Sequence, residues 1–325
     1  MTFDGVVARY HREIHVHCYR MLGSMEDADD LTQETFLRAW RHRGQFEGRS
    51  SYRRWLYRIA TNACLDALRR RRRRVLPVQI LSPSDPNPEP SSTVEGPWIE
   101  PYPDHLLARS SVDHEPQEVV VARETISLAF ITAIQMLTPK QRAVFILQGV
   151  LGWPAKETAT LLNTTVPAAN SALQRARAVM RDNLSPRSSE WSTPDRMTPE
   201  EERLLRRYID AHENGNHQEM ADLLADDARL SMPPSPTWYQ GRDAIVTFHR
   251  LHVIGTRGAG VLRLVPMMAN RQPAAGVYFR PPGASTYEAA VFDVLQVANG
   301  KVAEVTAFIR PDLFPAFGLA RSLEP

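Results

Sequence analysis

Six consecutive arginines at positions 69–74 are the densest charge in the sequence, and they follow a segment with helical spacing of apolar residues. Guanidinium groups in such a run can neutralise nucleic-acid phosphates, but a solvated charge run and a targeting signal have the same composition. Six successive side chains cannot all face one surface. We therefore expect a subset, Arg69 and Arg70, to contact a polyanion.

A second stretch with nucleic-acid-binding chemistry lies between residues 154 and 184. Residues 154–162 and a segment starting at Pro167 are predicted helices, and the turn between them gives a helix-turn-helix pattern. Amide, hydroxyl and guanidinium groups, which hydrogen-bond base edges and phosphates, share the outward face of the second helix. They are Asn170, Ser171, Gln174 and Arg177, with Arg175 at the edge. Taken alone, the pattern also fits an alanine-rich helix without a DNA role.

Histidines and cysteines near the N-terminus raise the question of a metal site. His11, His15 and His17 lie close to Cys18, but their spacing fits no known ligand frame, and a polar helix face explains them. With Cys64 the chain has two cysteines, which form neither a disulfide framework nor a zinc-ribbon spacing. The sequence therefore predicts no metal and no cofactor.

Composition places these motifs in a multidomain chain. The 325 residues are 43% hydrophobic and 23% charged, and no apolar run approaches the ~20 residues of a membrane span. The N-terminus lacks the apolar core of a signal peptide, so we expect a cytoplasmic protein. Net charge is +2, but residues 1–76 and 117–186 are basic while residues 77–116 are acidic. Two basic blocks around an acidic one indicate a polyanion contacted at two places.

Periodicity and proline content divide the chain into segments. Residues 4–76 and 117–184 have helical spacing throughout. The acidic, proline-rich segment between them reads as an extended linker, in which Trp98, Ile99 and Tyr102 must dock on a neighbouring domain or in a partner's cleft. After a helix at 199–214, alternating strands follow, and Asn299-Gly300 is a strong hairpin signal.

The predicted fold class follows from these segments. We expect two all-α domains, the second a helix-turn-helix, and a C-terminal α+β cone-shaped domain with a curved antiparallel sheet. The predicted boundaries are 1–76, linker 77–116, 117–186, linker 187–197 and 198–325.

The same segments resemble a known family. "DADDLTQETFLRAW" with "RSSYRRWLYRIATNACLDALRRRRR" resembles the second conserved region of bacterial RNA polymerase sigma factors of the sigma-70 family, extracytoplasmic-function group. "LTPKQRAVFILQGVLGWPAKETATLLNTTVPAANSALQRARAVM" resembles the fourth region. "LLADDARLSMPPSPTWYQGRDAI" and "FIRPDLFPAFGLA" resemble the SnoaL-like branch of the nuclear-transport-factor-2-like fold.

The resemblance implies a transcription-initiation function with RNA polymerase core and promoter DNA as partners. The acidic-polar helix of region two would dock on the coiled coil of the largest polymerase subunit through Asp30, Gln33 and Glu34. The flap of the second-largest subunit is the corresponding partner of region four. The acidic linker would thread the polymerase active-site cleft, where its charge mimics nucleic acid.

The resemblance also assigns the promoter contacts. The loop "QFEGRSS" would capture a flipped base of the −10 element, Asn62 would supply polar pocket contacts, and Tyr52 and Trp55 would stack on single-stranded DNA. Trp55 fits a core position equally well. The outward strip of the second basic module would read the −35 element in the major groove. Pro167 and Ala172 depart from the family pattern, and fewer charges imply weaker, more selective −35 binding.

Two roles compete for the C-terminal domain, and neither is enzymatic catalysis by a recognisable triad. It is either a regulatory module that replaces a separate anti-sigma protein, or a ligand sensor or cyclase-like domain with an apolar pocket. The candidate pocket residues are Met232, Trp238, Tyr239, His249 and Asp293. We favour a sigma factor, not an enzyme, modulated by this domain. The alternative is a DNA-binding regulator, independent of polymerase, fused to a sensing or isomerase-like domain.

Overall fold

The computed structural model describes residues 2–46, 51–107, 126–184, 196–253 and 260–325. The chain divides into two compact units. The first comprises residues 1–74, 99–102 and 106–192, and the second comprises residues 75–98, 103–105 and 193–325. The predicted linker is thus shared between the two units.

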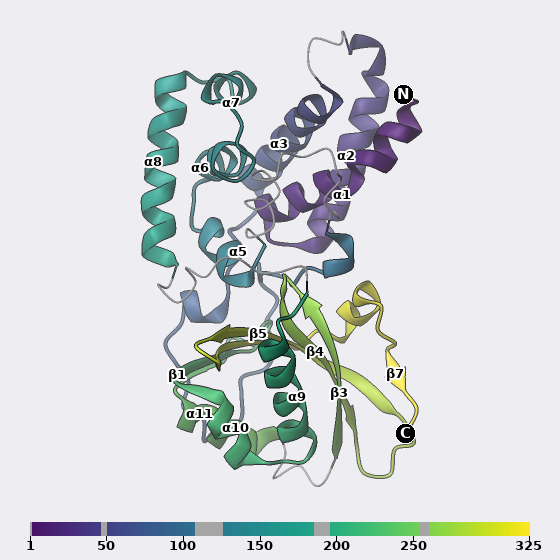
Figure 1. Ribbon diagram of the computed structural model, residues 1–325, viewed down its shortest axis with the longest axis vertical. Coiled ribbons are helices and arrows are strands. Elements are labelled where there is room, and N and C mark those ends of the chain that lie inside the picture. Colours follow the sequence, from purple (N-terminus) through teal and green to yellow (C-terminus); the bar gives the residue numbers. More distant parts are fainter. Residues whose placement is uncertain (1, 47–50, 108–125, 185–195, 254–259) are drawn as a thin grey trace. The chain divides into compact units, whose positions relative to one another are not determined.

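Three long helices build the first part of unit one: α1 (Phe3–Leu22), α2 (Met25–Arg41) and α3 (Tyr52–Arg70) (Figure 1). Each begins at a side-chain N-cap, from Thr2, Ser24 and Ser51, because a hydroxyl can accept a hydrogen bond from an otherwise unpaired amide of the first turn. Gly23 ends α1 at φ 71°, a left-handed conformation that glycine adopts without strain. The short connection sends α2 back along α1.

The rest of unit one is the second helical module: α5 (Leu128–Gln135), α6 (Pro139–Val144), a π-helical segment Phe145–Val150, α7 (Ala155–Leu161) and α8 (Val166–Asn183). Thr138 and Gln141 form a capping box at α6. Asn163, at φ 47°, makes the sharp turn between α7 and α8. The predicted helix-turn-helix is therefore present, with α8 beginning one residue before Pro167.

A buried arginine ties the second module to α1. Arg142 is 2% exposed, and its guanidinium donates to the carbonyl oxygens of Gln135 (3.0 Å), Leu137 (3.2 Å) and Met21. Burial lowers the pKa of Arg142 to about 10. Removing this side chain would leave several buried carbonyl groups without a donor, which costs about 1–3 kcal/mol each.

Unit two is an α+β domain. Its helices are α9 (Pro199–Glu213), α10 (His217–Leu223) and α11 (Arg242–Phe248). Its strands are β1 (Leu224–Ser231), β2 (Trp238–Gln240), β3 (Val261–Ala269), β4 (Gln272–Arg280), β5 (Tyr287–Ala298), β6 (Lys301–Phe308) and β7 (Ser322–Leu323). The strands form one sheet in the order β2-β1-β6-β5-β4-β3, with β7 pairing with β5.

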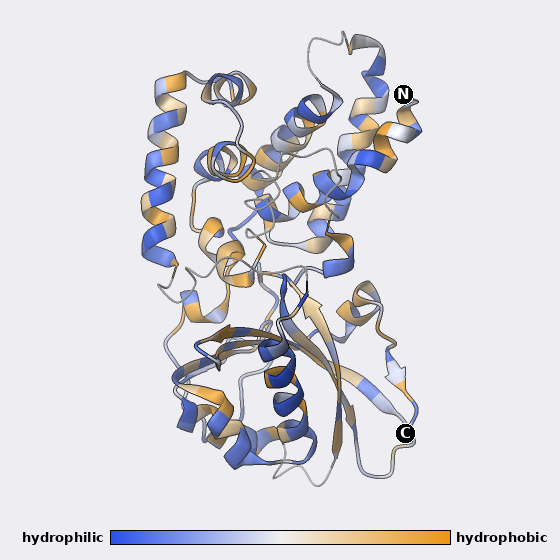
Figure 2. Ribbon diagram, in the orientation of Figure 1, coloured by the Kyte–Doolittle hydropathy of each residue, from blue (hydrophilic) through white to orange (hydrophobic). Residues whose placement is uncertain are grey.

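The predicted hairpin is confirmed at Asn299-Gly300, which joins β5 to β6 with φ of 53° and 69°. One pairing departs from a purely antiparallel sheet, because β1 runs parallel to β6. The core lies between the sheet and the apolar side of α9, which contributes Leu204, Leu205 and Tyr208. Figure 2 shows hydrophilic residues on the opposite side of α9. The fold class is confirmed.

Among the helices of the described residues, none is both long enough and apolar enough to cross a bilayer.

Candidate functional site

The arginine run is divided between internal ion pairs and open surface. Helix α3 ends at Arg70, so the following residues leave the helix. Asp27 accepts from Arg74 at 2.7 Å and also pairs with Arg71. Arg69 and Arg70 are exposed, and Arg69 pairs with Asp66 at 2.8 Å. Within the described residues, no ion pair involves the three exposed arginines of the run, Arg70, Arg72 and Arg73.

Aromatic rings cluster at the start of α3. Phe46 stacks on Tyr52 with centroids 4.2 Å apart and lies 5.1 Å from the ring of Trp55. Tyr52 and Trp55 are half-buried, so Trp55 is not a core residue. Asn62 is exposed on α3, seven residues after Trp55 and hence on the same helix face. Residues 47–50 of the predicted capture loop lie outside the described residues.

An open apolar groove of about 660 Å³ lies between α1 and α2. Leu37 is 56% exposed and Trp40 is 46% exposed, although both belong to the apolar stripe of α2. Phe3 packs against Trp40 with centroids 5.1 Å apart, and Gln33 lines the same groove. Leu31 and Phe36, from the same stripe, are buried.

The remaining predicted docking residues lie on the same helix. Asp30 is exposed, and Glu34 accepts from Arg38 at 2.5 Å. Carboxylate, amide and apolar groups thus share one side of α2. Sequence periodicity found the apolar stripe but not that half of it remains uncovered.

The outward strip of α8 has the predicted orientation. Ala169, Leu173, Ala176 and Met180 are buried against the module. The opposite face exposes Asn170, Ser171, Gln174, Arg175 and Arg177. This face is free of ion pairs within the described part of the chain, so its donors and acceptors remain available to a ligand.

The linker is anchored in unit one by a short segment around Glu100. The carboxylate of Glu100 accepts from Ser24 Oγ and from the Met25 amide, both at 2.9 Å, at the N-terminus of α2. The hydroxyl of Tyr102 lies 2.5 Å from His15 Nδ1, and the Tyr19 hydroxyl donates to the Glu100 carbonyl at 2.7 Å. Ile99 and Tyr102 are buried here, while Trp98 is half-buried.

The two histidines of the candidate metal site have other partners. His15 Nε2 also contacts Asp29 at 2.8 Å, and His17 Nε2 contacts the Thr61 hydroxyl at 3.0 Å. Burial lowers the pKa of His17 to about 3, so its ring is neutral. Cys18 and Cys64 are buried free thiols.

Residues 81–94, which we call the linker strap, are held by unit two through hydrogen bonds. The Ser84 amide donates to the Trp238 carbonyl at 2.8 Å, and the Trp238 indole donates to the Leu81 carbonyl at 3.0 Å. The Val94 amide donates to the Pro234 carbonyl at 3.0 Å. Three further bonds join Ser91 to Thr237 and Ser235 and His252 to the carbonyl of Pro86.

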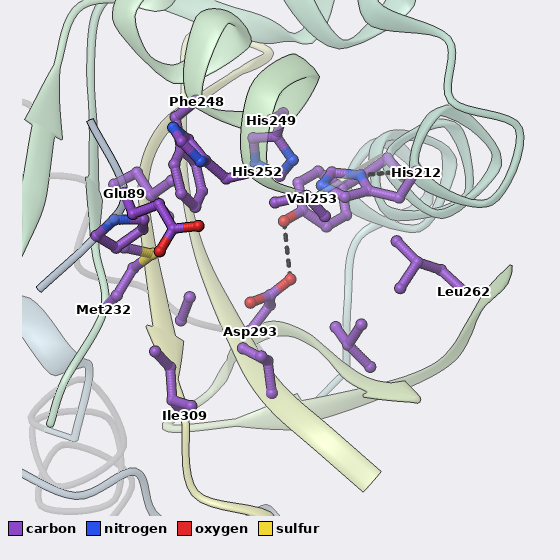
Figure 3. A pocket seen from close by; sticks show the side chains of 16 residues that line it. Glu89, His212, Met232, Phe248, His249, His252, Val253, Leu262, Asp293 and Ile309 are labelled. Atoms are coloured by element: carbon purple, nitrogen blue, oxygen red, sulfur yellow. Dashed lines mark hydrogen bonds between the residues drawn. The ribbon is translucent and has the colours of Figure 1, made fainter. Parts of the chain in front are cut away.

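A cavity of about 300 Å³ lies in unit two, beside the linker strap (Figure 3). Apolar side chains of the sheet, α11 and the segment after it form most of its lining. The polar residues lining it are Glu89, Tyr208, His212, His249, His252 and Asp293. Three predicted pocket residues, Met232, His249 and Asp293, do line it.

The other two predicted pocket residues, Trp238 and Tyr239, lie elsewhere. Trp238 contacts the linker strap, and the Tyr239 ring packs on Phe248 with centroids 4.7 Å apart. Sequence reasoning missed Tyr208 and His212. Their spacing of four residues on a predicted helix was the available signal, since it places both on one helix face.

The polar groups of the cavity are strongly perturbed by burial. The Tyr208 hydroxyl donates to Asp293 Oδ2 at 2.9 Å (Figure 3). Burial raises the pKa of Asp293 to about 7, and this hydrogen bond opposes the rise. Burial lowers the pKa of His212 to about 4 and that of His249 well below its usual value, so both rings are neutral at pH 7.

Comparisons with known proteins match each part of the chain. Residues 6–74 match Sigma-70 region 2, residues 127–180 match Sigma-70, region 4, and residues 205–305 match the SnoaL-like domain. ECF RNA polymerase sigma factor SigG of Mycobacterium tuberculosis is 43% identical over 322 residues, covering 99% of this chain and 85% of the relative. ECF RNA polymerase sigma factor SigE of Mycolicibacterium smegmatis is 30% identical over 194 residues, covering 58% of this chain and 64% of the relative.

The fold has a match over nearly the whole chain. The crystal structure of the extracytoplasmic function sigma factor SigJ of Mycobacterium tuberculosis aligns with a TM-score of 0.60 at 22% identity, covering 97% of this chain and all of that one. Two sigma-70 modules in order, a SnoaL-like domain, and 43% identity along nearly the full length leave one conclusion. The chain belongs to the ECF RNA polymerase sigma factors and carries a SnoaL-like domain fused at its C-terminal side.

Proposed function

We propose that the chain binds the RNA polymerase core in the cytoplasm and directs it to promoters with a −10 and a −35 element. The observation that carries this proposal is the pairing, in one chain, of an uncovered apolar groove on α2 with an exposed base-reading strip on α8. A polymerase-independent DNA-binding protein has no use for the groove. Run-off transcription with purified core tests the proposal, and a permanganate footprint of melted promoter DNA distinguishes initiation from duplex binding.

The groove and the polar side of α2 would meet the coiled coil of the largest polymerase subunit. Asp30, Gln33 and Glu34 would orient the complex by charge and hydrogen bonding, while Leu37 and Trp40 would supply buried apolar area. The second module would contact the flap of the second-largest subunit.

The aromatic cluster of α3 would open the −10 element. Phe46, Tyr52 and Trp55 offer ring faces on which unstacked bases can lie, and Asn62 adds a donor and an acceptor on the same helix face. Stacking of this kind is worth about 1–3 kcal/mol per base, which offsets the cost of extruding a base.

The arginine run gives a quantitative expectation for salt. Because Arg71 and Arg74 are engaged by Asp27, we expect Arg70, Arg72 and Arg73 to hold phosphates, with Arg69 released from Asp66 to join them. The triple change of those three exposed arginines to alanine should flatten the plot of log K against log salt by about 2–3, at roughly 0.9 per phosphate.

The measurement is promoter-fragment affinity of the holoenzyme between low and moderate salt. Arg203→Ala, Arg206→Ala and Arg207→Ala on α9 remove the same charge from the C-terminal domain and serve as the control. An unchanged slope in the first triple variant would contradict the assignment.

The α8 strip should determine −35 recognition. Gln174→Ala and Arg177→Ala each remove a side chain that can bond a base edge or phosphate, so each should weaken −35-dependent initiation by about 1–3 kcal/mol, roughly 10- to 100-fold. Arg181→Ala, on the last turn of the same helix, is the matched control and should have little effect. Run-off transcription on templates with intact and scrambled −35 elements measures it. Equal losses on both templates would point to a folding defect instead.

We further propose that the C-terminal domain regulates the sigma modules by competing for the linker. A linker that threads the polymerase cleft must be free of the domain, whereas the strap makes six hydrogen bonds to it here. A chain ending at Pro186 lacks that competitor and should change promoter activity with core polymerase. The cavity beside the strap supports a binding role for a small molecule, and not a catalytic one, as the source of regulation.

A further inference from the structure

The cavity of unit two has a chemical character that limits what it can hold. No lysine or arginine is among the residues that line it, all of which belong to the described ranges. Two carboxyl groups, from Asp293 and Glu89, face a lining that is otherwise mostly apolar. An anionic ligand would therefore meet negative charge without a counter-ion, at a cost of several kcal/mol.

The cavity also does not favour a charged group of its own. Asp293 is 5% exposed, and burial holds its carboxyl group largely protonated up to about pH 7. The neighbouring rings of His212 and His249 are neutral, with centroids 4.9 Å apart. Surroundings that disfavour a carboxylate and two imidazolium ions give no solvation to an ion brought from outside.

Polar hydrogen-bonding capacity nevertheless remains unused at one end. Asp293 bonds Tyr208 through one carboxyl oxygen, and Figure 3 shows the other oxygen directed into the cavity. Within the described residues, that oxygen, His212 Nε2 and His249 Nδ1 make no hydrogen bond. His212 is 4% exposed and His249 8%, so these are buried polar side chains lining the space. Buried polar groups in folded proteins normally have partners, which indicates that a ligand or water supplies them.

The linker strap forms part of the cavity wall. Glu89 and Pro90 line the space, and the hydrogen bonds of Ser84, Ser91 and Val94 hold the strap on both sides of them. A molecule in the cavity therefore contacts the strap as well as the sheet. Occupancy and strap position must then influence one another, because a ligand that contacts the bound strap stabilises it.

We propose that this cavity binds an uncharged, largely apolar small molecule with one hydroxyl or carbonyl group, which hydrogen-bonds Asp293 while the apolar body contacts the sheet and the linker strap. The inference rests on the proposed ligand-binding role of the domain. It adds the ligand's class and its contact with the linker.

A series of bicyclic probes tests the class on the full chain by titration calorimetry. 2-Naphthol should bind at least tenfold more tightly than naphthalene, which lacks the polar group, and at least a hundredfold more tightly than 2-naphthoate. Equal affinity for naphthalene, tighter binding of 2-naphthoate or of 2-naphthylmethylammonium, or no binding of 2-naphthol would each overturn the proposal.

A cavity-filling variant locates the binding. Ala307→Phe places a ring into the lining of the cavity and should reduce 2-naphthol affinity at least tenfold. Ala303→Phe makes the same change on the same strand at a residue outside the lining, and it should bind as the parent does. Circular dichroism of both variants shows whether each domain is folded. Equal binding by the two variants would contradict the assigned site.

Hydrogen exchange tests the contact with the linker. Saturating 2-naphthol should slow exchange of the Ser84, Ser91 and Val94 amides about tenfold in the parent chain, because these amides bond to the domain that the ligand stabilises. Binding without slower exchange would refute the strap contact. Binding is measured without polymerase, so a failure of transcriptional regulation alone would count against the proposed function and leave the site intact.

Discussion

Leu37→Asp should abolish initiation while leaving the chain folded. Leu37 is 56% exposed, so an aspartate there is solvated in the free protein and costs the fold little. In the complex it would bury a carboxylate among the apolar groups of the groove and of the polymerase. Apolar anchors in interface centres carry about 2–4 kcal/mol, so we expect core affinity to fall at least 30-fold and run-off product to disappear.

The measurement is the equilibrium binding of labelled protein to core polymerase, with run-off transcription in parallel. Val261→Asp is the matched control, since Val261 is a 41% exposed apolar residue of the C-terminal domain and should leave core affinity unchanged. Wild-type affinity in Leu37→Asp would remove the groove from the polymerase interface.

The groove also shows where sequence periodicity stops being informative. Spacing of three and four residues correctly grouped Leu31, Phe36, Leu37 and Trp40 on one stripe of α2. Periodicity identifies an apolar face but not what covers it. In the structure α1 and α3 cover the first part of the stripe, and the second part stays open. A stripe that serves both a core and a partner has one sequence signature.

Local signals predicted the fold well because they act over a few residues. Thr138-Pro139, Asn163 and Asn299-Gly300 fix helix starts and turns through their own hydrogen bonds and φ angles, and each lies where the sequence put it. The parallel pairing of β1 with β6 was not predictable in this way. It joins strands more than 70 residues apart, and no short-range pattern encodes it.

The cavity was half predicted for a related reason. Met232, His249 and Asp293 were identified by type, but Trp238 and Tyr239 are consecutive residues of β2 and so point to opposite faces of the sheet. Tyr208 was missed because its partner Asp293 lies 85 residues later. The linker strap was invisible for a further reason. Most of its hydrogen bonds use backbone groups, which every sequence provides.

Asp293→Asn should stabilise the C-terminal domain in alkaline solution and do so progressively less as the solution is acidified. The carboxyl group titrates at about pH 7 when folded and near 3.9 when unfolded, so the folded state retains its proton over a wider range. For an acid with a raised pKa, the penalty on folding is absent below about pH 4, grows between pH 4 and 7, and is complete above pH 7. Three pKa units correspond to roughly 4 kcal/mol.

Asparagine has no charge to bury, and its amide oxygen can still accept from Tyr208. Any cost of burying its amide nitrogen is the same at every pH, so the difference between variant and parent should grow by about 2–3 kcal/mol from pH 5 to pH 8. Calorimetric scans of the full chain measure it, with the domain's transition identified by its loss in a chain ending at Pro186. Asp210→Asn, on the exposed side of α9, is the control and should show a difference independent of pH. A pH-independent difference for Asp293→Asn would mean that its carboxyl group is solvated in the folded chain, and the apolar cavity around it would then lose its main electrostatic support.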